Sequence, residues 1–494
     1  MKKLFVIFLI VAIVASGLVL INNVKAATDV SGEITTDTTW TLANSPYSFT
    51  GPVTIDTGVK LTIEAGATVN ISTYYLQVNG TLYAKGTSAS NINFVSNTSS
   101  YTTQINFASS SVSWNEEAGT GCIIENAQIN ALIAINGASP KINSNTINDN
   151  TASTTDINVV VSVSGGSAVI SNNNLNGAVE VKNGGSPKVS SNKITGGMSL
   201  YRGSPVVSYN NISGGIGNDV IAITQESAPT VSYNTITGNT NGVAFNMHNN
   251  GYSNNSYSAT ITNNTISNCP TGIGIGNGAG NILLSSNTIF GSETGIAIGS
   301  NIEASTTIEY NLIMNNTYGI DVGSQTTIQK NTILNNTIGI YYESENESVI
   351  IYNNIQNNIQ YNLKLSLTSP TTVNATYNWW GTTDIPKINQ TIYDSKNNTN
   401  LGTVVFLPAL SQPSPEAPTV PNYNLNPTPS PTPSPTPTAT PTGNPTATPH
   451  YTAQPTETAA VTETGFGVLE ILIIVIVIII ALLAVAIFLI KRRQ

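Results

Sequence analysis

The stretch "VSYNTITGNTNGVAF", Val231 to Phe245, contains the pattern that decides the fold of this chain. Its first six residues recur as "VSYNNI" (207–212), "LSSNTI" (284–289), "IEYNLI" (308–313), "IQKNTI" (328–333) and "IIYNNI" (350–355). A repeat with a mean spacing of about 23 residues indicates a solenoid. The recurring asparagines are Asn145, Asn173, Asn192, Asn210, Asn234, Asn264, Asn287, Asn311, Asn331, Asn353 and Asn378.

The spacing inside the motif predicts a corner at the asparagine. Val231 and Ile236 are five residues apart. A straight strand has a side-chain period of two, so this odd offset cannot direct both residues inward. The chain must therefore bend between them. Asn234 suits the bend because asparagine tolerates left-handed backbone angles and bonds neighbouring backbone groups. We expect these asparagines to point inward, as a structural column and not as ligand sites.

A glycine follows eight residues after several of the asparagines, and each opens a short apolar run such as "GIGI" or "GIDV". These glycines are Gly242, Gly272, Gly295, Gly319 and Gly339. Valine, isoleucine, threonine, asparagine and glycine, which favour strands and turns, dominate the repeats. Each repeat is therefore predicted as strand, corner, strand, turn, glycine and strand, followed by a return segment of variable length.

These repeats resemble the right-handed parallel β-helix family, which includes pectate-lyase-like enzymes and NosD-type repeat proteins. Residues 32–72 and 76–96 resemble the opening coils of such surface proteins, and "ATYNWWGTTD" (375–384) resembles their closing motif. The resemblance implies that the corner asparagines stack in a ladder. We predict an all-β, right-handed parallel β-helix solenoid, with capping coils at 27–120 and repeats with a Trp-Trp-Gly closing motif at 121–405.

The two ends of the chain predict export and membrane anchoring. Residues 1–26 have a basic start, an apolar run and small residues before Thr28, as in a signal peptide, although the run is long enough for a retained anchor. Residues 468–490 are apolar with one charge, and a basic tail at 491–494 follows, which favours a transmembrane helix with a cytoplasmic C-terminus. The Pro/Thr-rich segment 406–467 is predicted to be a disordered stalk. We expect a single-pass cell-membrane protein with its β-helix outside.

Charge and cysteine usage exclude several partners. The net charge is −9 with 17 Lys and Arg, so no basic surface for nucleic acid is expected. Cys122 and Cys269 lie about six coils apart, or about 30 Å at strand spacing. A disulfide needs Cα atoms within about 7 Å, so we expect no disulfide.

The sequence offers little for catalysis or metal binding. The exported region has one arginine, Arg202, whose nearest acidic candidates are Asp219 and Glu180. The acids are mostly scattered, whereas paired carboxylates are needed for glycoside hydrolysis. The acidic run "YESENES" (342–348) permits a calcium site or a solvated loop. His248 has no partner ligands nearby, so the copper association of NosD-type relatives finds no support. We predict no catalytic residue, no metal and no cofactor.

Tyrosines and glycosylation signals remain as candidate surface features. Tyrosine rings spaced at the coil repeat could stack on sugar faces or simply pack on one another. Among twelve Asn-x-Ser/Thr sequons, Asn211 and Asn263 flank a corner and are predicted to point outward, where glycan is possible. The tyrosines, each directly before a corner asparagine, are Tyr209, Tyr233, Tyr310, Tyr352 and Tyr377.

Three functions remain open from the sequence. The first is a non-catalytic surface β-helix on a stalk, for adhesion, contact with an envelope polysaccharide or envelope structure. The second is a surface polysaccharide lyase or glycoside hydrolase, which rests on the resemblance alone. The third, a metal-delivery module, needs a cluster of metal ligands. The basic tail and single span favour a prokaryote, and the stalk and sequons favour an archaeon.

Overall fold

The computed structural model describes residues 26–96, 103–148, 158–215, 219–238, 242–248, 256–300, 302, 305–366 and 372–420. They belong to one compact unit within Met1–Tyr423. The predicted transmembrane helix, the basic tail, most of the stalk and all but the last residue of the predicted signal peptide lie outside the described residues. Within the described part of the chain, no helix is long and apolar enough to cross a membrane.

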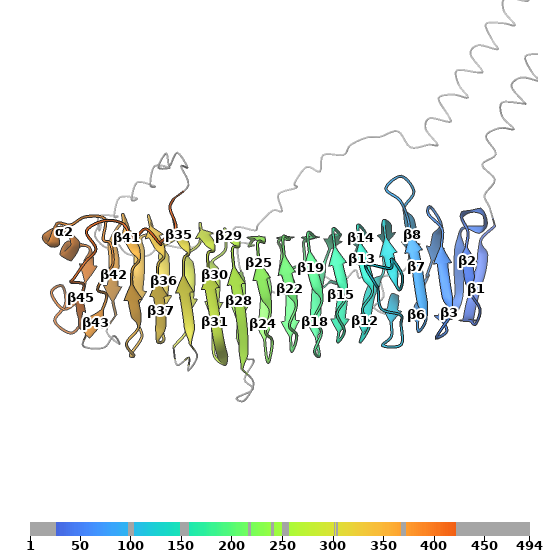
Figure 1. The fold of residues 1–494 in the computed structure, drawn as a ribbon, viewed down its shortest axis with the longest axis horizontal. Helices are drawn as coiled ribbons and strands as arrows, with labels where there is room; N and C mark the ends of the chain where they lie inside the picture. The colour runs from blue at the N-terminus through green and yellow to red at the C-terminus, as the bar shows by residue number, and fades with distance from the viewer. Residues whose placement is uncertain are drawn as a thin grey trace, which may run out of the picture. The chain divides into compact units, whose positions relative to one another are not determined.

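The described chain coils through three stacks of short parallel strands, which we call sheets 1, 2 and 3 (Figure 1). Sheet 1 has 14 strands. They are β2 (Thr38–Trp40), β4 (Lys60–Ile63), β7 (Thr81–Lys85), β10 (Ile123–Glu125), β13 (Lys141–Asn143), β16 (Val169–Ser171), β19 (Lys188–Ser190), β22 (Val206–Ser208), β25 (Thr230–Ser232), β28 (Tyr257–Thr262), β31 (Ala279–Ser285), β34 (Thr306–Glu309), β37 (Thr326–Gln329) and β40 (Val349–Ile351).

Sheets 2 and 3 are joined through one long strand, β3, which pairs with β5 at one end and with β6 at the other. Sheet 2 follows the corners and consists of β5 (Thr68–Asn70), β8 (Ile92–Val95), β11 (Ala127–Ile129), β14 (Thr146–Asn148), β17 (Asn174–Asn176), β20 (Lys193–Ile194), β23 (Asn211–Ile212), β26 (Thr235–Thr237), β29 (Thr265–Ser267), β32 (Thr288–Phe290), β35 (Leu312–Met314), β38 (Thr332–Leu334) and β41 (Asn354–Gln356).

Sheet 3 closes each coil before the chain returns to sheet 1. It consists of β1 (Thr28–Ile34), β3 (Tyr47–Ile55), β6 (Tyr75–Val78), β9 (Gln104–Phe107), β12 (Leu132–Asn136), β15 (Val159–Ser164), β18 (Ala178–Lys182), β21 (Met198–Tyr201), β24 (Ile221–Thr224), β27 (Val243–Met247), β30 (Thr271–Ile275), β33 (Thr294–Ile298), β36 (Tyr318–Val322), β39 (Ile338–Tyr342), β42 (Tyr361–Leu365) and β44 (Ile392–Tyr393).

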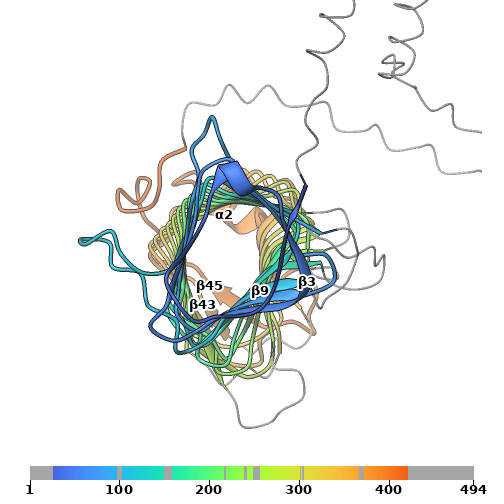
Figure 2. The same cartoon turned by 90° about the vertical axis from the view of Figure 1, so that its right-hand side faces the viewer.

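Successive coils superimpose on a common outline when viewed along the stack, with loops protruding from it (Figure 2). Every strand pair in the three sheets is parallel, and the register places like residues above one another, as for Ile212, Ile236 and Ile266. These side chains are buried completely and belong to one continuous core. The predicted parallel β-helix solenoid is therefore confirmed.

The two ends of the described coils are closed in different ways. Near the N-terminal end, the rings of Trp40 and Tyr47 stack at 4.9 Å, and Phe49 meets Trp40 edge-on. The other end carries a short helix, α2 (Ile385–Gln390), together with the paired strands β43 (Thr372–Asn374) and β45 (Thr403–Val405). Trp380 and Ile388 are buried there. One short 3-10 helix, η1 (Leu42–Asn44), completes the elements of the described residues.

The first part of the segment predicted as the stalk, 406–467, contacts the coils. Residues 408–420, which we call the strap, lie against the coils and bond to them, for example through Leu410 N to Asn378 O at 3.0 Å. Ser414 and Ala417 of the strap are buried. The strap contains several prolines and so resembles the stalk in composition, but its Val420 packs on apolar side chains of sheet 2.

Candidate functional site

The corner asparagines form one continuous hydrogen-bonded ladder inside the turn between sheets 1 and 2. In every step, Oδ1 of one asparagine accepts from both the backbone N and the Nδ2 of the preceding one, at 2.8–3.1 Å. Nδ2 also donates to a carbonyl of the preceding coil, as Asn234 does to Val207 O. All eleven asparagines are at most 3 % exposed, so they are out of reach of a ligand.

The left-handed residue at each corner is not the asparagine but the residue before it. Tyr233 has φ +59° and Ser286 has φ +59°, and the other corners follow the same pattern. The expectation that asparagine itself takes the left-handed angles is therefore corrected. The reason is geometric, because the strained residue turns its side chain outward and the next residue then turns inward to bond. This explains why a tyrosine can occupy the outward position.

A second, shorter ladder was missed by the sequence analysis. Asn316, Asn336 and Asn358 stack at the turn between sheets 2 and 3, with Asn316 Nδ2 to Asn336 Oδ1 at 3.0 Å and Asn336 Nδ2 to Asn358 Oδ1 at 3.0 Å. Ser292 and Cys269 follow left-handed residues, Gly291 and Asn268, in earlier coils, as Asn316 follows Asn315. The repeated "NNT" at 315–317 and 335–337 carries the signal, in its second asparagine.

The two cysteines lie buried in the core of different coils, and neither forms a disulfide. Six strand pairings of sheet 2 separate β11, which follows Cys122, from β29, which precedes Cys269. Burial raises the pKa of each thiol to about 11, so both stay protonated and unreactive at neutral pH.

The five candidate tyrosines lie outward at their corners but do not form one column. Tyr209 and Tyr233 stack with ring centroids 5.1 Å apart and planes within 6°, and Tyr352 and Tyr377 are tilted at 5.9 Å. Asn263 and Ser286 occupy the two corners between Tyr233 and Tyr310 and interrupt the rings. Tyr310 is half-buried, because Lys330 lies over its ring at 5.3 Å. Tyr209 and Tyr233 remain the most exposed, at 62 % and 51 %.

Both glycosylation candidates are exposed. Asn263 occupies the left-handed corner position at φ +57°, and Asn211 begins β23.

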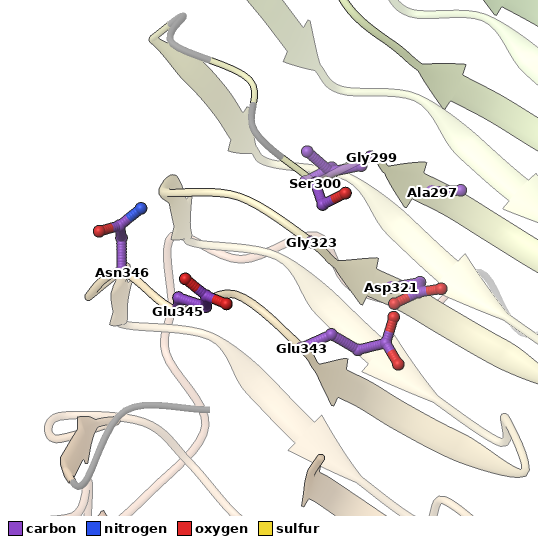
Figure 3. A pocket seen from close by; sticks show the side chains of 9 residues that line it. Ala297, Gly299, Ser300, Asp321, Gly323, Glu343, Glu345 and Asn346 are labelled. Carbon is purple, nitrogen blue, oxygen red and sulfur yellow. The ribbon is translucent and has the colours of Figure 1, made fainter. Parts of the chain in front are cut away.

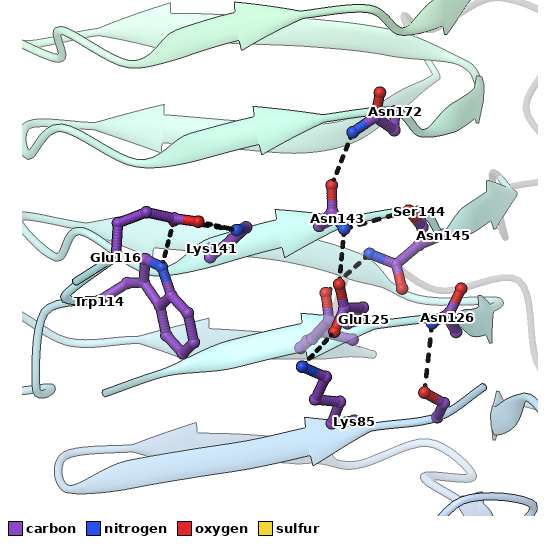
Figure 4. Close-up of polar contacts among 12 residues, drawn as sticks. Lys85, Trp114, Glu116, Glu125, Asn126, Lys141, Asn143, Ser144, Asn145 and Asn172 are labelled. Atoms are coloured by element: carbon purple, nitrogen blue, oxygen red, sulfur yellow. Dashed lines mark hydrogen bonds and ion pairs between the residues drawn. The ribbon is translucent and has the colours of Figure 1, made fainter. Parts of the chain in front are cut away.

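Near the first asparagine of the long ladder, the charged side chains are paired with neighbouring charged and polar groups. Figure 4 shows Glu125 between Lys85, at 3.0 Å, and Asn143 Nδ2, at 2.7 Å, on adjacent strands of sheet 1. Nearby, Glu116 accepts from Trp114 Nε1 at 2.6 Å and pairs with Lys141 at 2.7 Å. These bonds hold the pKa of Glu116 below its usual range, with Lys141 as the largest cause. The cluster pins the loop before Cys122 onto the coil.

A pocket lies on the outer face of sheet 3, where β33, β36 and β39 are adjacent (Figure 3). Its volume is about 500 Å³. Gly299 and Gly323 contribute no side chains to the pocket lining. The side chains of Asp321 and Glu343 also line it and point toward one another (Figure 3). The complete lining is Ala297, Ile298, Gly299, Ser300, Asp321, Gly323, Glu343, Glu345 and Asn346.

Asp321 is the chemically unusual residue of this pocket. Its Oδ1 is buried without a hydrogen-bond partner. Burial, and secondarily the charge of Glu343, raises the pKa of Asp321 to about 6. A carboxyl group with such a pKa can donate a proton near neutral pH. In the strand register, Asp321 occupies the outward position that Gly274 and Ala297 occupy in earlier coils and Tyr341 in the next. Return segments of unequal length hide this alignment in the sequence.

Tyrosine rings lie on β36, which carries the pocket residue Asp321, and on β39, which directly precedes Glu343, although none of them lines the pocket. Tyr341 occupies the strand position next to Asp321, and its ring lies 5.5 Å from that of Tyr318. Lys364 follows in the next coil, with its Nζ 5.5 Å from the Tyr341 ring and 5.6 Å from the Tyr393 ring. Burial raises the pKa of Tyr341 to about 12, with Glu343 adding to the shift. Sheet 3 therefore presents carboxylates, small residues and tyrosines side by side.

The other candidates for chemistry lie apart from this pocket. Arg202 meets Glu226 at 3.5 Å, and not Asp219 or Glu180, in an exposed ion pair. Glu180 pairs with Lys182, and Asp219 accepts from Asn246. Of the run 342–348, Glu343 and Glu345 line the pocket while Tyr342 and Ser344 turn inward. Among the described residues, no group of three or more His, Cys, Asp or Glu is arranged to hold a metal.

Comparison with known proteins finds one matching family. Residues 243–378 match the model of the family described as "Periplasmic copper-binding protein (NosD)". The described residues do not fit copper, since His248 stands without a second ligand and both cysteines are buried in different coils. No curated protein matches the chain.

One solved structure similar to the chain is described as "Crystal Structure of the periplasmic alginate epimerase AlgG". The similarity covers 72 % of this chain and 75 % of that one, at 12 % identity and a TM-score of 0.24. The segment 243–378, which is similar to the NosD family, lies within the parallel β-helix of this chain.

Proposed function

We propose that this protein is a non-catalytic, extracytoplasmic β-helix that contacts a polysaccharide along the outer face of sheet 3. The main support is the pocket lined by Asp321, next to the ring pair of Tyr341 and Tyr318. Hydrogen-bond acceptors and small residues of the pocket lie close to aromatic rings there. Sugar hydroxyls donate to carboxylates and amides, and the apolar faces of a sugar ring pack on tyrosine. A solenoid repeats such contacts at the coil spacing, which suits an extended polymer.

The charge of the pocket narrows the class of polysaccharide. Asp321, Glu343 and Glu345 are the ionisable groups of its lining, and all three are acidic. A polymer of uronic acids would be repelled there, so a neutral or amino-sugar polymer is the expected ligand. The Tyr209–Tyr233 pair lies at a sheet 1–sheet 2 corner, on a different part of the surface, and is a second candidate contact.

The test is a glycan array with the full chain in mild detergent. Replacing Tyr341 by alanine is expected to weaken binding about five- to thirtyfold, because one ring–sugar contact is worth about 1 to 2 kcal/mol. Tyr209→Ala/Tyr233→Ala tests the corner pair in the same way. The matched control is Tyr75→Ala, an exposed tyrosine on β6 far from the pocket. Absence of binding by the unmodified chain to every glycan would leave only a structural role.

A second function, a polysaccharide lyase or glycoside hydrolase, is favoured by one observation. Asp321 and Glu343 face one another in a single pocket, and the pKa of Asp321 is raised to about 6. A protonated acid beside a second carboxylate is the arrangement that glycosidases use. The test is product release from the glycan that binds, measured as new reducing ends or unsaturated sugars. Asp321→Asn abolishes turnover while retaining binding if the protein is an enzyme, and no turnover by the unmodified chain excludes it.

We also propose that the C-terminal segment 468–490 anchors the β-helix to the cell membrane with the stalk as spacer. Support comes from the apolar run and the basic residues that follow it. The test is protease treatment of intact cells that express the chain with a C-terminal tag. Loss of the β-helix from cells, with the tag protected in the membrane fraction, is expected. A tag found in the soluble fraction of unproteolysed cells contradicts the anchor.

A further inference from the structure

The strap runs back along the solenoid from its C-terminal end. Its first contacts are with the last coil, where Tyr377 N donates to Pro408 O at 2.6 Å and Leu410 N to Asn378 O at 3.0 Å. Its last described residue, Val420, packs against the cluster of Leu312, Met314 and Leu334 on β35 and β38, and Pro418 and Thr419 line a small hollow together with Leu312. The strap therefore travels opposite to the order of the coils, and the described chain leaves the β-helix beside β35 instead of at its end.

Each coil that the strap crosses holds it by a separate contact. At β41, Ser414 N donates to Asn354 Oδ1 at 2.7 Å and Asn354 Nδ2 donates to Ser414 O at 3.4 Å. At β38, Thr332 Oγ1 donates to Pro418 O at 2.6 Å, and Lys330 pairs with Glu416 at 2.6 Å. Since β41, β38 and β35 are successive strands of sheet 2, the strap ties these coils together along the stack.

The surface beneath the strap differs from the rest of sheet 2. Leu312, Met314 and Leu334 point outward there, form a small apolar cluster with Phe290 and Val420, and are at most 6 % exposed. At the equivalent outward positions of earlier coils stand Thr235, Thr237 and Thr265. Apolar outward residues thus occur where the strap covers them, which marks the strap as a built part of the fold.

A solenoid needs such a device at its end. Each coil is stabilised mainly by its neighbours, and the last coil has a neighbour on one side only. End coils therefore open more readily than central coils. The C-terminal coil includes the two-strand pair β43–β45, which the remaining sheets do not extend. The strap is hydrogen-bonded to the last coil at one end and packs beside β35 at the other. Opening of the last coil therefore also breaks contacts with the coils that precede it.

We propose that the strap is a C-terminal clamp, which couples the opening of the last coil to that of the coils at β41, β38 and β35. The clamp takes the place of a capping repeat, the element that solenoids place at an end. Its contacts are a buried apolar residue, backbone hydrogen bonds and one ion pair. The ion pair includes an exposed carboxylate, so salt weakens only part of the clamp.

Hydrogen exchange followed by mass spectrometry on the full chain tests the clamp. In the test chain, residues 408–420 are replaced by a Gly/Ser segment of equal length. Peptides from the last coil, residues 372–405, are expected to exchange at least tenfold faster, while peptides from β24 to β27 are unchanged. The matched control replaces residues 428–440 of the Pro/Thr-rich region in the same way and leaves both rates unchanged. Exchange of the last coil at the unmodified rate, without the strap, overturns the proposal.

A second variant keeps the test decisive if the Gly/Ser chain does not fold. Asn354→Ala/Glu416→Lys removes the hydrogen bonds at β41 and repels Lys330 while retaining the apolar contacts of the strap. Peptides of the strap and of the last coil are expected to exchange faster together, each about threefold or more. Glu345→Lys makes the same charge change away from the strap and serves as control. Faster exchange in the strap with an unchanged last coil, or no change in either, contradicts the clamp.

Discussion

At the scale of single residues, the corner works because two neighbours divide its tasks. The residue before the asparagine accepts a left-handed backbone, and the asparagine then fills the inside of the turn with one acceptor and two donors. Asn234 uses all of these groups, at Asn210, Asn264, Val207 and Ser232. A side chain without both functions would leave buried backbone groups unpaired, which costs more than a hydrogen bond contributes.

Replacing Asn234 by alanine is expected to lower the free energy of unfolding by about 2 to 4 kcal/mol, because the amide of Asn210 loses its acceptor in a buried site. Urea denaturation of the full chain measures this. Ser232→Ala, one strand position before the corner and half-exposed, is the control and should change stability by less than about 0.5 kcal/mol. Equal effects of the two substitutions would show that the ladder contributes nothing specific.

The corner also explains the sequons. In "NNT" at 263–265, the first asparagine suits the left-handed position and the second is the ladder residue. Threonine is favoured at the start of the following strand. The fold alone therefore accounts for this sequon. A sequon that arises this way is no evidence for glycan. Asn211 and Asn263 stay predictions, which mass spectrometry of the native protein can test.

The raised pKa of Asp321 predicts a pH dependence of stability. Its folded pKa, about 6, lies above the unfolded value of about 4, so folding favours the protonated form. The stabilisation is complete below about pH 4 and is lost as pH rises through 6. After allowance for partial solvent screening, the loss is about 1 to 2 kcal/mol. Asp321→Asn should flatten the stability profile between pH 4 and pH 7, whereas Glu345→Gln should not. A profile unaffected by Asp321→Asn would contradict the assignment.

At the scale of elements, glycines set how closely the turn between sheets 2 and 3 can stack. A Cβ on Gly295 would lie 2.6 Å from Gly319 O, and one on Gly319 would lie 2.5 Å from Gly339 O. Neither glycine has a left-handed φ, so the requirement is close approach and not backbone freedom. The glycine at the second position of β33 and of β36 is thus a packing requirement between neighbouring coils.

Gly319→Ala is therefore expected to destabilise the protein by about 2 to 3 kcal/mol, the range for overpacking. Thermal unfolding followed by circular dichroism measures the effect. Gly274→Ala, on the outer face of β30, is the control because the nearest neighbour of its Cβ would be the Val243 side chain, at an ordinary contact distance of 3.4 Å. A Gly319→Ala protein as stable as the Gly274→Ala protein would mean that the coils separate without cost at this turn.

At the scale of the whole described unit, the solenoid is a sum of coils and neighbour interfaces. Coils of different lengths stack because the variable return segments lie outside the sheets. The ladder step from Asn287 to Asn311 and the pairing of β32 with β35 define one complete coil. Removal of a complete coil should keep every remaining residue in register.

Deletion of residues 287–310, which joins Ser286 to Asn311, is expected to give a folded protein with a melting temperature within a few degrees of the original. Deletion of residues 287–308 removes a similar length but shifts the corner by two residues, and should unfold or aggregate. Circular dichroism and hydrogen exchange distinguish the two. Comparable stability of both deletions would show that register along the ladder is not required.

The sequence by itself determined the repeat, the corner and the inward asparagines, because these depend on local spacing that recurs in every coil. An offset of five between Val231 and Ile236 forces a bend wherever it occurs. The free cysteines followed from the same period. Local spacing could not determine the strap, whose contacts at β41 and β38 join residues 60 or more apart, Asn354 with Ser414 and Thr332 with Pro418. Nor could it bring Asp321, Tyr341 and Glu343 together with Gly299, since return segments of unequal length hide which outward positions align. That alignment is decided by the hydrogen bonds between coils, and so the candidate site is a property of the tertiary structure.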